Sequence, residues 1–316
     1  MNYESLVGST VLVTGGAGFI GSHLVDGLLA AGATVRVLDN FETGQRTNLA
    51  HVIDRIQLME ADIRDLDACQ RACENVDYVL HEAALGSVPR SMATPANTVA
   101  VNVAGTANVF TAARDNKVKR VVYASSSSVY GSSERLPKRE GEEGAPLSPY
   151  ALSKSMNEQL AEVFERCFGL QLVGLRYFNV YGPRQDPNGP YAAVIPKFFA
   201  SCRAGKAPVI YGDGSQTRDF TFVADVVRAN LLALLATTGS GRAYNVGAGQ
   251  RTSVNDLAIT VIRATEMQLE PAYEEARPGD VKDSLADTSS MRDTFGWEPT
   301  TQLIDGIRLS AEYYQR

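Results

Sequence analysis

The feature that most constrains the fold is a glycine cluster that directly follows an apolar, β-branched run near the start of the chain. The run covers residues 10–14, and the glycines are Gly15, Gly16, Gly18 and Gly21. A helical pattern follows over residues 19–31. Glycines at this spacing allow a tight turn and a close approach of a helix to a strand. The segment therefore predicts a strand–turn–helix unit, the first unit of an α/β fold.

Apolar runs and helical patterns continue to alternate through the first half of the chain. The further runs cover residues 34–38, 56–59, 76–80, 120–124 and 170–175, and the further helical patterns cover 65–74, 95–115 and 150–168. Runs that are apolar almost throughout are typical of strands covered on both faces. Because strands alternate with helices, we predict crossover units and a parallel sheet. The expected fold class is α/β, a Rossmann-type doubly wound parallel sheet with a smaller α/β cap.

The alternation breaks after about residue 178, where a turn-rich stretch occupies residues 182–190. Later patterns predict a helix near 223–237, a strand at 243–246 and helices near 252–266 and 302–314. We expect residues 1–178 to form the sheet domain, with 222–247 returning to it. Residues 179–221 and 248–316 are expected to form the cap, interleaved with the sheet domain.

Composition excludes several function classes. The 316 residues carry a formal net charge of -6, which disfavours binding to nucleic acid or to an anionic membrane surface. No run of 18 uncharged apolar residues occurs, so no membrane span is expected, and we predict a soluble, cytoplasmic protein. The four cysteines form no C-x-x-C pair and the three histidines are scattered, so we expect no metal site.

The glycine cluster also predicts a ligand. Gly15, Gly18 and Gly21 form a G-x-x-G-x-x-G pattern at the start of a helix, where backbone N–H groups can bind a pyrophosphate. Asp39 ends the next strand, and a carboxylate there can accept hydrogen bonds from ribose hydroxyls and repel a 2′-phosphate. Asn40 follows rather than an arginine, which favours NAD over NADP, although Arg46 could reverse that preference.

A second set of side chains indicates proton transfer. Tyr150 and Lys154 lie one helical turn apart on one face of the predicted helix. Hydroxyl groups at residues 125–128 directly follow a buried strand, where they need hydrogen-bond partners. The positive charge of Lys154 can lower the pKa of Tyr150, which would let the phenol oxygen accept a proton near neutral pH.

Together these motifs resemble the extended short-chain dehydrogenase/reductase family. Within that family the chain is most similar to the nucleotide-sugar 4-epimerases that act on UDP-N-acetylhexosamines. The resemblance covers nearly the whole chain and rests on motifs at residues 14–21, 39–40, 81–84, 86–91, 125–131, 148–154, 175–183, 191–196, 218–220 and 277–280. It implies NAD as cofactor, a UDP-sugar as substrate, and a homodimer formed through the helices near 95–115 and 150–168.

The motifs and the resemblance assign candidate residues to three groups. The catalytic group is Ser126, Tyr150 and Lys154. The cofactor group is Gly15, Gly18, Phe19, Ile20, Gly21, Asp39, Asn40, Asp62, Ile63, Ala83, Ala84, Asn102, Tyr150, Lys154 and Tyr177. In it, Asp62 is a candidate adenine contact, with an exposed turn carboxylate as the alternative reading. The substrate group is Gly86, Ser87, Arg90, Ser126, Ser127, Tyr150, Asn179, Ala193, Val194, Arg218, Arg277, Asp280 and Ser284.

The resemblance also implies a reaction. NAD would take hydride from C4 of the sugar while Tyr150 takes the hydroxyl proton, and hydride would return to the opposite face of a 4-keto sugar. Dehydratases of the family carry carboxylates where this chain has Ser127 and Ser128, so epimerisation is favoured. Ser284 stands where a bulky residue would exclude an N-acetyl group, which favours UDP-GlcNAc/UDP-GalNAc. UDP-glucose/UDP-galactose and UDP-uronic acids remain alternatives, and a dehydratase or reductase is less favoured.

Overall fold

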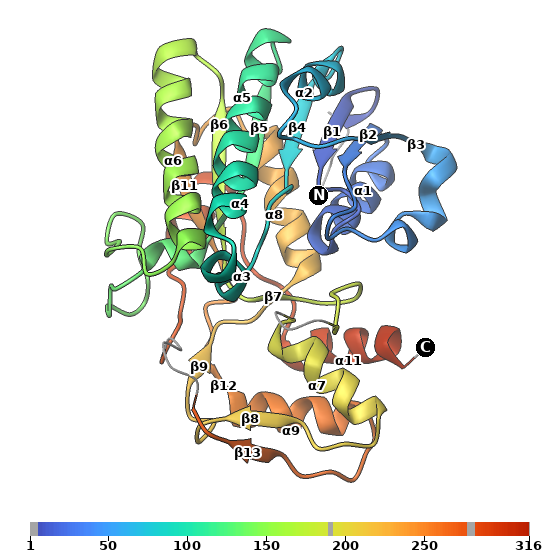
Figure 1. Ribbon diagram of the computed structural model, residues 1–316, viewed down its shortest axis with the longest axis vertical. Coiled ribbons are helices and arrows are strands. Elements are labelled where there is room, and N and C mark those ends of the chain that lie inside the picture. The colour runs from blue at the N-terminus through green and yellow to red at the C-terminus, as the bar shows by residue number, and fades with distance from the viewer. Residues whose placement is uncertain (1–5, 189–191, 277–281, 316) are drawn as a thin grey trace.

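A seven-stranded parallel sheet forms the centre of the computed structural model, which describes residues 6–188, 192–276 and 282–315 (Figure 1). Its strands are β1 (Thr10–Thr14), β2 (Thr34–Asp39), β3 (Ile56–Glu60), β4 (Tyr78–His81), β5 (Arg120–Ser126), β6 (Leu172–Tyr177) and β11 (Arg242–Val246). Their order is β11-β6-β5-β4-β1-β2-β3. The order reverses direction between β1 and β4, and ligands of open α/β sheets bind at such a switch point. The predicted fold class is confirmed.

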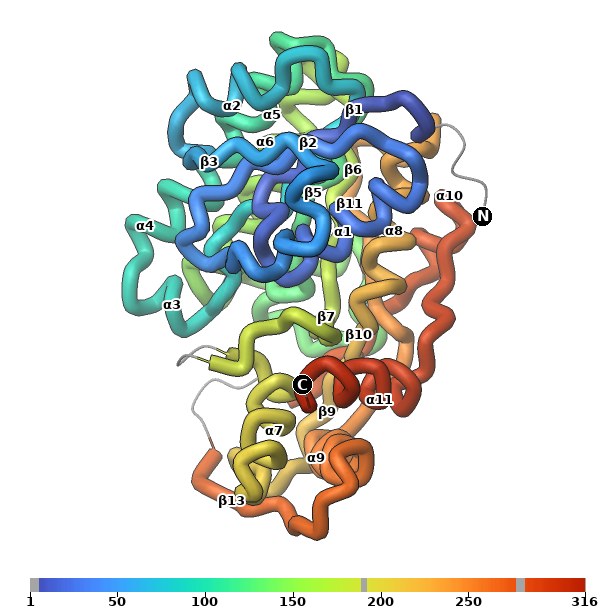
Figure 2. The backbone as a smooth tube through the Cα atoms, turned by 90° about the vertical axis from the view of Figure 1, so that its right-hand side faces the viewer, coloured from blue at the N-terminus to red at the C-terminus, as the bar shows by residue number. Residues whose placement is uncertain are grey.

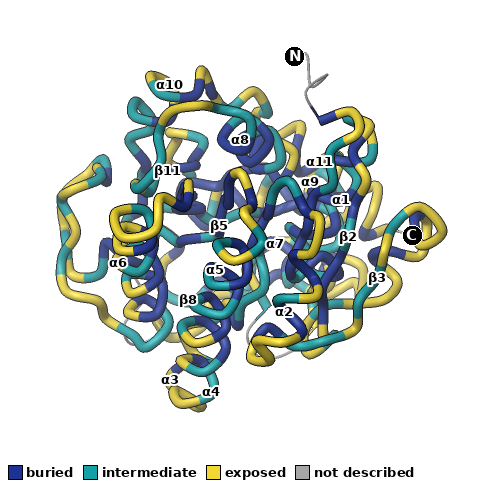
Figure 3. The backbone as a smooth tube through the Cα atoms, turned by 90° about the horizontal axis from the view of Figure 1, so that it is seen from above, coloured by how far each residue is buried: buried dark blue, intermediate teal, exposed yellow. Residues whose placement is uncertain are grey.

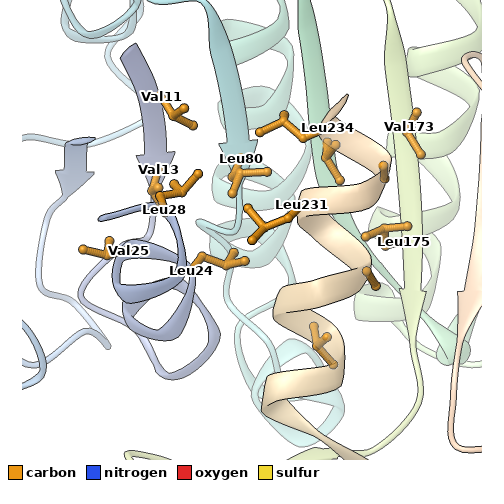
Figure 4. Close-up of a cluster of buried hydrophobic side chains, with 14 of the residues drawn as sticks. Val11, Val13, Leu24, Val25, Leu28, Leu80, Val173, Leu175, Leu231 and Leu234 are labelled. Atoms are coloured by element: carbon orange, nitrogen blue, oxygen red, sulfur yellow. The ribbon is translucent and has the colours of Figure 1, made fainter. Parts of the chain in front are cut away.

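Helices cover both faces of this sheet. One face carries α1 (Phe19–Ala30) and α8 (Val223–Leu235), and the other carries α2 (Leu66–Cys73), α5 (Thr106–Asp115) and α6 (Pro149–Phe168). Side chains along β1 alternate between the faces. Val11 and Val13 pack with Leu24 of α1 and Leu231 of α8 (Figure 4), whereas Leu12 belongs to the core on the other face. This alternation explains why the strands are apolar almost throughout.

Short helices complete the sheet domain. They are η2 (Arg46–Asn48), η3 (Ala50–Arg55), α3 (Val88–Ala93), α4 (Pro95–Val99), η4 (Ala100–Gly105) and η5 (Ser127–Tyr130). The π-helical turn η4 joins α4 to α5, so the helix predicted over 95–115 is continuous. Viewed from above, buried segments fill the middle of the molecule, and α3 and α4 lie at its edge (Figure 3).

A smaller cap lies at one end of the sheet domain (Figures 1 and 2). It contains α7 (Val194–Arg203), α9 (Val254–Ala264) and α11 (Leu303–Tyr314), with the strand pairs β8 (Val209–Tyr211) with β13 (Ala272–Glu274) and β9 (Thr217–Arg218) with β12 (Thr252–Ser253). Phe198, Leu257 and Ile307 contribute to its own hydrophobic core. The pair β7 (Val180–Tyr181) with β10 (Thr221–Phe222) contributes aromatic side chains to the same core.

The chain crosses between the two regions more often than the sequence pattern predicts. Residues 222–247 contribute α8 and β11 to the sheet layer. In addition, α10 (Ser289–Phe295) packs beside β11, and Phe295 and Trp297 lie in the core of the sheet domain. The indole N–H of Trp297 donates to the carbonyl of Asp225 at 3.0 Å. The segment that contains α10 and Trp297 therefore packs on the sheet domain, and only part of the range 248–316 belongs to the cap.

The part of the chain that the structure describes contains no helix that is both long and apolar enough to cross a membrane.

Candidate active site

The glycine turn between β1 and α1 is built in a way that only glycine allows. Gly15 has φ = 68°, and a Cβ atom there would lie 2.7 Å from the backbone nitrogen of Ala83. A Cβ atom on Gly21 would lie 2.2 Å from the carbonyl oxygen of Gly15. Gly18 is the N-cap residue of α1 and supplies no side chain to the helix N-terminus. The first N–H groups of α1 therefore stay open to a ligand, as a pyrophosphate requires.

The turn opens into a cleft of about 260 Å³. The structure brings most of the predicted cofactor group together there: Gly15, Gly18, Phe19, Ile20, Gly21, Asp39, Asn40, Asp62, Ile63, Ala83 and Ala84, with Gly86 of the substrate group. Sequence reasoning did not identify Glu42, Thr43, Gly44 and Glu82, which also line the cleft. Glu82 directly follows β4 and precedes Ala83 and Ala84, which were predicted. That position at a strand end is the sequence signal that identifies it.

The carboxylate of Asp39 is held at the end of β2. It accepts hydrogen bonds from the backbone N–H groups of Ala17 and Phe41, each at 2.8 Å. Burial raises the pKa of Asp39, and the two backbone hydrogen bonds oppose that rise. Arg46 forms an ion pair with Glu60 at 2.5 Å and stacks on the ring of Phe41. The arginine that could have bound a 2′-phosphate is thus already paired, which fits NAD.

Asp62 lies at the same end of the cleft. Its carboxylate accepts hydrogen bonds from Arg64 at 2.6 Å and from the side-chain amide of Asn40 at 2.7 Å. The hydrogen bond from Arg64, helped by the one from Asn40, lowers the pKa of Asp62 to about 2. Asp62 is therefore ionised at neutral pH, and it ties Asn40 to the loop after β3. Its contact with adenine stays a prediction.

Ser126, Tyr150 and Lys154 meet beyond the end of β5. The hydroxyl of Ser126 accepts a hydrogen bond from the N–H of Ser128 at 3.2 Å and is itself hydrogen bonded to Tyr150. Ser148 caps α6, which places Tyr150 in its first turn. The ammonium of Lys154 donates to the carbonyl of Ala124 at 2.8 Å and lies 6.0 Å from the centroid of the Tyr150 ring. The end of β5 positions Ser126 and the first turns of α6 position Tyr150 and Lys154, so the three side chains form one cluster.

The pKa of Tyr150 is raised, whereas the sequence led us to expect that Lys154 would lower it. Burial raises the pKa of Tyr150, the hydrogen bond with Ser126 lowers it, and the charge of Glu82 raises it. The expected depression by Lys154 is not found. Burial also lowers the pKa of Lys154 to about 8, although Glu82 and Glu158 oppose this change. Desolvation of the phenol outweighs attraction to the ammonium, so Tyr150 is protonated at neutral pH in the described structure.

Asn102 and Tyr177 lie beneath the cleft instead of lining it. The side-chain carbonyl of Asn102 accepts from the N–H of Leu85 at 2.8 Å, and its amide donates to Ser153 at 3.1 Å. Asn102 therefore joins the loop after β4 to α6. The hydroxyl of Tyr177 donates to Glu82 at 2.7 Å and accepts from Asn230 at 2.9 Å. Both residues hold the walls of the cleft in place, and direct cofactor contacts by them stay predictions.

A second cavity, of about 580 Å³, lies against the cap. Three predicted substrate residues, Asn179, Val194 and Arg218, line it together with Lys197 and aromatic side chains that include Phe220. Val194 is the first residue of α7, and Ala193 is its N-cap, so a positive helix end adjoins the cavity. Cationic side chains, a helix N-terminus and aromatic rings are the groups that bind a nucleoside diphosphate.

Four other predicted substrate residues are not among those that line these two cavities: Ser87, Arg90, Ser127 and Ser284. Ser87 caps α3 by accepting from the N–H of Arg90 at 3.2 Å. Ser127 begins η5, and Ser284 is 9% exposed with its N–H donating to the carbonyl of Thr217. Arg277 and Asp280 lie outside the described residues.

Comparison with known proteins identifies the family. Residues 11–247 match the NAD dependent epimerase/dehydratase family. The chain belongs to this family. It is therefore an enzyme, and NAD is its cofactor.

Three relatives illustrate the similarity. A putative UDP-glucose 4-epimerase of Methanocaldococcus jannaschii is 39% identical over 300 residues, which cover 94% of this chain and 96% of the relative. The structure of a UDP-N-acetylglucosamine 4-epimerase from Methanobrevibacter ruminantium, in complex with UDP-N-acetylmuramic acid, is 39% identical, with a TM-score of 0.93 and coverage of 97% and 98%. A UDP-glucose 4-epimerase of Thermus thermophilus in complex with NAD is 36% identical, with a TM-score of 0.87 and coverage of 96% and 98%.

Proposed function

We propose that this protein inverts C4 of a UDP-sugar through a transient 4-keto sugar, with NAD as cofactor. The observation that carries the proposal is the cluster of Ser126, Tyr150 and Lys154, which interacts with Glu82 of the dinucleotide cleft. The same chain has a second cavity, lined by Arg218, that suits a nucleoside diphosphate. Relatives that are 4-epimerases over their full length support this assignment.

The side chains perform proton transfer and orientation. NAD supplies the hydride acceptor for C4 when bound. Tyr150, which is protonated in the described structure, must first lose that proton, and its phenolate then accepts the proton of the 4-hydroxyl group. The hydroxyl of Ser126, which accepts from the N–H of Ser128, can donate to the phenolate oxygen and so orient it. Lys154, held by the carbonyl of Ala124, supplies positive charge that stabilises the phenolate before it accepts this proton. After the 4-keto sugar has rotated within the site, the same groups return the proton.

Dehydration has no acid and base in the corresponding places. Ser127 and Ser128 begin η5 where a dehydratase needs carboxylates. A carboxylate close by, that of Glu158, is engaged with Arg176 at 2.7 Å and 2.9 Å and with Ser125 at 2.5 Å. Its oxygens already accept hydrogen bonds from Arg176 and Ser125, so this carboxylate is not free to act on a leaving hydroxyl. Return of hydride to the 4-keto sugar is therefore favoured over dehydration.

For the sugar, we infer UDP-GlcNAc and UDP-GalNAc. The small side chain of Ser284 supports this, as does Gly86, since a Cβ atom on Gly86 would meet no atom within 4 Å. The open space at Gly86 is compatible with an N-acetyl group. A UDP-N-acetylglucosamine 4-epimerase is among the similar structures. UDP-glucose/UDP-galactose is the alternative that a UDP-glucose 4-epimerase among the relatives supports.

The test is a substrate panel. The purified enzyme is incubated with UDP-GlcNAc, UDP-glucose, UDP-glucuronic acid and a TDP-sugar without added NAD, and formation of each 4-epimer is followed. We expect the highest kcat/KM for UDP-GlcNAc. Ser284→Tyr is expected to lower turnover of the acetylated sugar selectively, by tenfold or more if about 1.4 kcal/mol of steric cost falls on the N-acetyl group. Equal loss on UDP-glucose contradicts the role of Ser284.

We also propose that the enzyme is a homodimer. On the outer face of α6, Leu152, Met156 and Val163 are 47%, 38% and 39% exposed and follow helical spacing. A second copy of the same surface would cover this apolar stripe, with a two-fold axis relating the helices. Light scattering is expected to give twice the chain mass, and Leu152→Glu to give monomers. Ile304→Glu, at an exposed apolar position on α11, is the control and should leave the dimer intact.

We infer a cytoplasmic location. Cys69 and Cys73 are free and buried, and burial raises the pKa of each thiol to about 12. Such thiols stay reduced in the cytosol without a partner. Fractionation of the source cells should recover the enzyme with the cytosolic proteins.

A further inference from the structure

Glu82 is a carboxylate in the cofactor cleft that the proposed mechanism does not use. It directly follows β4, and its N–H donates to the carbonyl of Thr14 at 3.1 Å. Its backbone packs against Gly15 of the pyrophosphate turn, where a Cβ atom would approach within 3.0 Å of the Glu82 carbonyl carbon. The side chain is partly accessible, and it lines the cleft.

Several elements surround this carboxylate. Tyr177 of β6 donates a hydrogen bond to it at 2.7 Å, and Asn230 of α8 holds the same hydroxyl from the other side. Lys154 of α6 is the cation that interacts with it, and Tyr150 of the same helix is the neighbouring phenol. His81, the preceding residue, is neutral because burial lowers its pKa to about 3.

The direction of the dinucleotide places the nicotinamide near Glu82. Asp39, the pyrophosphate turn at Gly15 and Glu82 all line the cleft, and the charge of Glu82 acts on both Tyr150 and Lys154, which must face the reacting carbon. Glu82 stands between the turn and Lys154. The nicotinamide half must therefore pass this carboxylate on its way from the turn to Tyr150.

We propose that Glu82 is a positioning residue that makes the site prefer NAD⁺ over NADH, through attraction between its carboxylate and the cationic ring of the oxidised cofactor. The nicotinamide ring is positively charged in NAD⁺ and neutral in NADH. A carboxylate within a desolvated cleft therefore stabilises the oxidised form selectively. An epimerase must return hydride to the sugar in every cycle, so this preference favours the second hydride transfer over release of the 4-keto sugar. The inference rests on NAD as the cofactor and is independent of which sugar is bound.

Protonation of Glu82 gives the preference a pH dependence. Burial raises the pKa of Glu82 to about 7, against the hydrogen bond from Tyr177 and the charge of Lys154. Binding of NAD⁺ favours the ionised carboxylate, so the preference for NAD⁺ should increase as pH rises through 7. Lys154 loses its proton near pH 8 and adds a second, separate step.

The experiment measures the bound cofactor directly and needs no sugar. The enzyme is equilibrated with mixtures of NAD⁺ and NADH, free cofactor is removed by gel filtration, and the two bound forms are quantified. At pH 8, Glu82→Gln is expected to lower the bound NAD⁺-to-NADH ratio at least tenfold, about 1.4 kcal/mol, because glutamine keeps the acceptor for Tyr177 but removes the charge. The step near pH 7 should disappear in this variant, while the Lys154 step remains.

Glu42→Gln is the matched control. Glu42 lines the same cleft, but its N–H donates to Asn40 at the adenosine end, which is identical in NAD⁺ and NADH. This variant should leave the ratio unchanged. A folded Glu82→Gln protein with the wild-type ratio overturns the proposal, even if it has lost epimerase activity.

A second variant keeps the test decisive if Glu82→Gln does not fold. Tyr177→Phe retains the charge of Glu82 and removes the hydrogen bond that lowers its pKa. The step in the NAD⁺-to-NADH ratio is then expected to move above pH 7. An unchanged midpoint assigns the step to another group and overturns the proposal.

Discussion

Replacing Glu158 with glutamine removes the anion from a buried network that joins the catalytic helix to β5 and β6. Arg176 of β6 donates to both carboxylate oxygens of Glu158, at 2.9 Å and 2.7 Å, and its side chain is 7% exposed. Its guanidinium also contacts Glu143 and the hydroxyl of Tyr130. Ser125 donates to Glu158 at 2.5 Å. The substitution therefore leaves a buried guanidinium with half of its negative partners.

Breaking a buried ion pair on one side destabilises a protein by about 3–5 kcal/mol. Two features reduce that cost here, because glutamine keeps one acceptor and Glu143 still faces Arg176. We therefore expect the free energy of unfolding to fall by about 3 kcal/mol. For a chain of this size the loss corresponds to a decrease in Tm of roughly 4–5 °C.

The same substitution should change catalysis through Lys154. The charge of Glu158 raises the pKa of Lys154, which lies one helical turn before it. Without that charge the pKa of Lys154 falls below about 8, so the ammonium loses its proton at lower pH. The alkaline limb of the pH profile of kcat/KM is expected to shift to lower pH. A variant with a merely structural defect would lose activity equally across the profile.

Calorimetry and the pH profile together test this reasoning. Glu162→Gln is the control, since Glu162 is exposed on the same helix and should change stability by less than about 0.5 kcal/mol. If Glu158→Gln matches the Tm of this control, Arg176 does not depend on Glu158 and the argument fails. If Tm falls but the alkaline limb does not move, the electrostatic link to Lys154 is wrong.

Three further variants test separate parts of the site. Tyr150→Phe should lower kcat by about 10²–10⁴-fold while NAD stays bound, because only the proton acceptor is lost; near-full activity would exclude Tyr150 as the base. Gly21→Ala should abolish NAD binding, since its Cβ would lie 2.2 Å from the carbonyl oxygen of Gly15; a binding titration decides. His81 is buried with its pKa lowered to about 3. The unfolded chain therefore binds this proton first, so His81 contributes a loss of about 2 kcal/mol in stability between pH 7 and 5; the wild type should lose that much relative to His81→Asn over this range.

Local sequence determined the parts of this site that lie within one element. The glycine turn, the strand before it and the helix after it are adjacent in sequence, so their pattern predicts their geometry. Tyr150 and Lys154 share a helix face because they are four residues apart. The sheet domain likewise follows from alternating strands and helices, because crossover connections are right-handed and short.

Tertiary structure decided which groups surround the reacting atoms. Glu82 meets Tyr177, 95 positions away, and Tyr177 meets Asn230, a further 53 positions along the chain. Trp297 returns to α8 through contacts that no local period encodes. The pKa of Tyr150 is raised and not lowered, because the packing of distant elements buries the phenol and brings the charge of Glu82 near it. Residue spacing specifies which side chains share an element, whereas desolvation and charge balance arise only when distant elements close around the cleft.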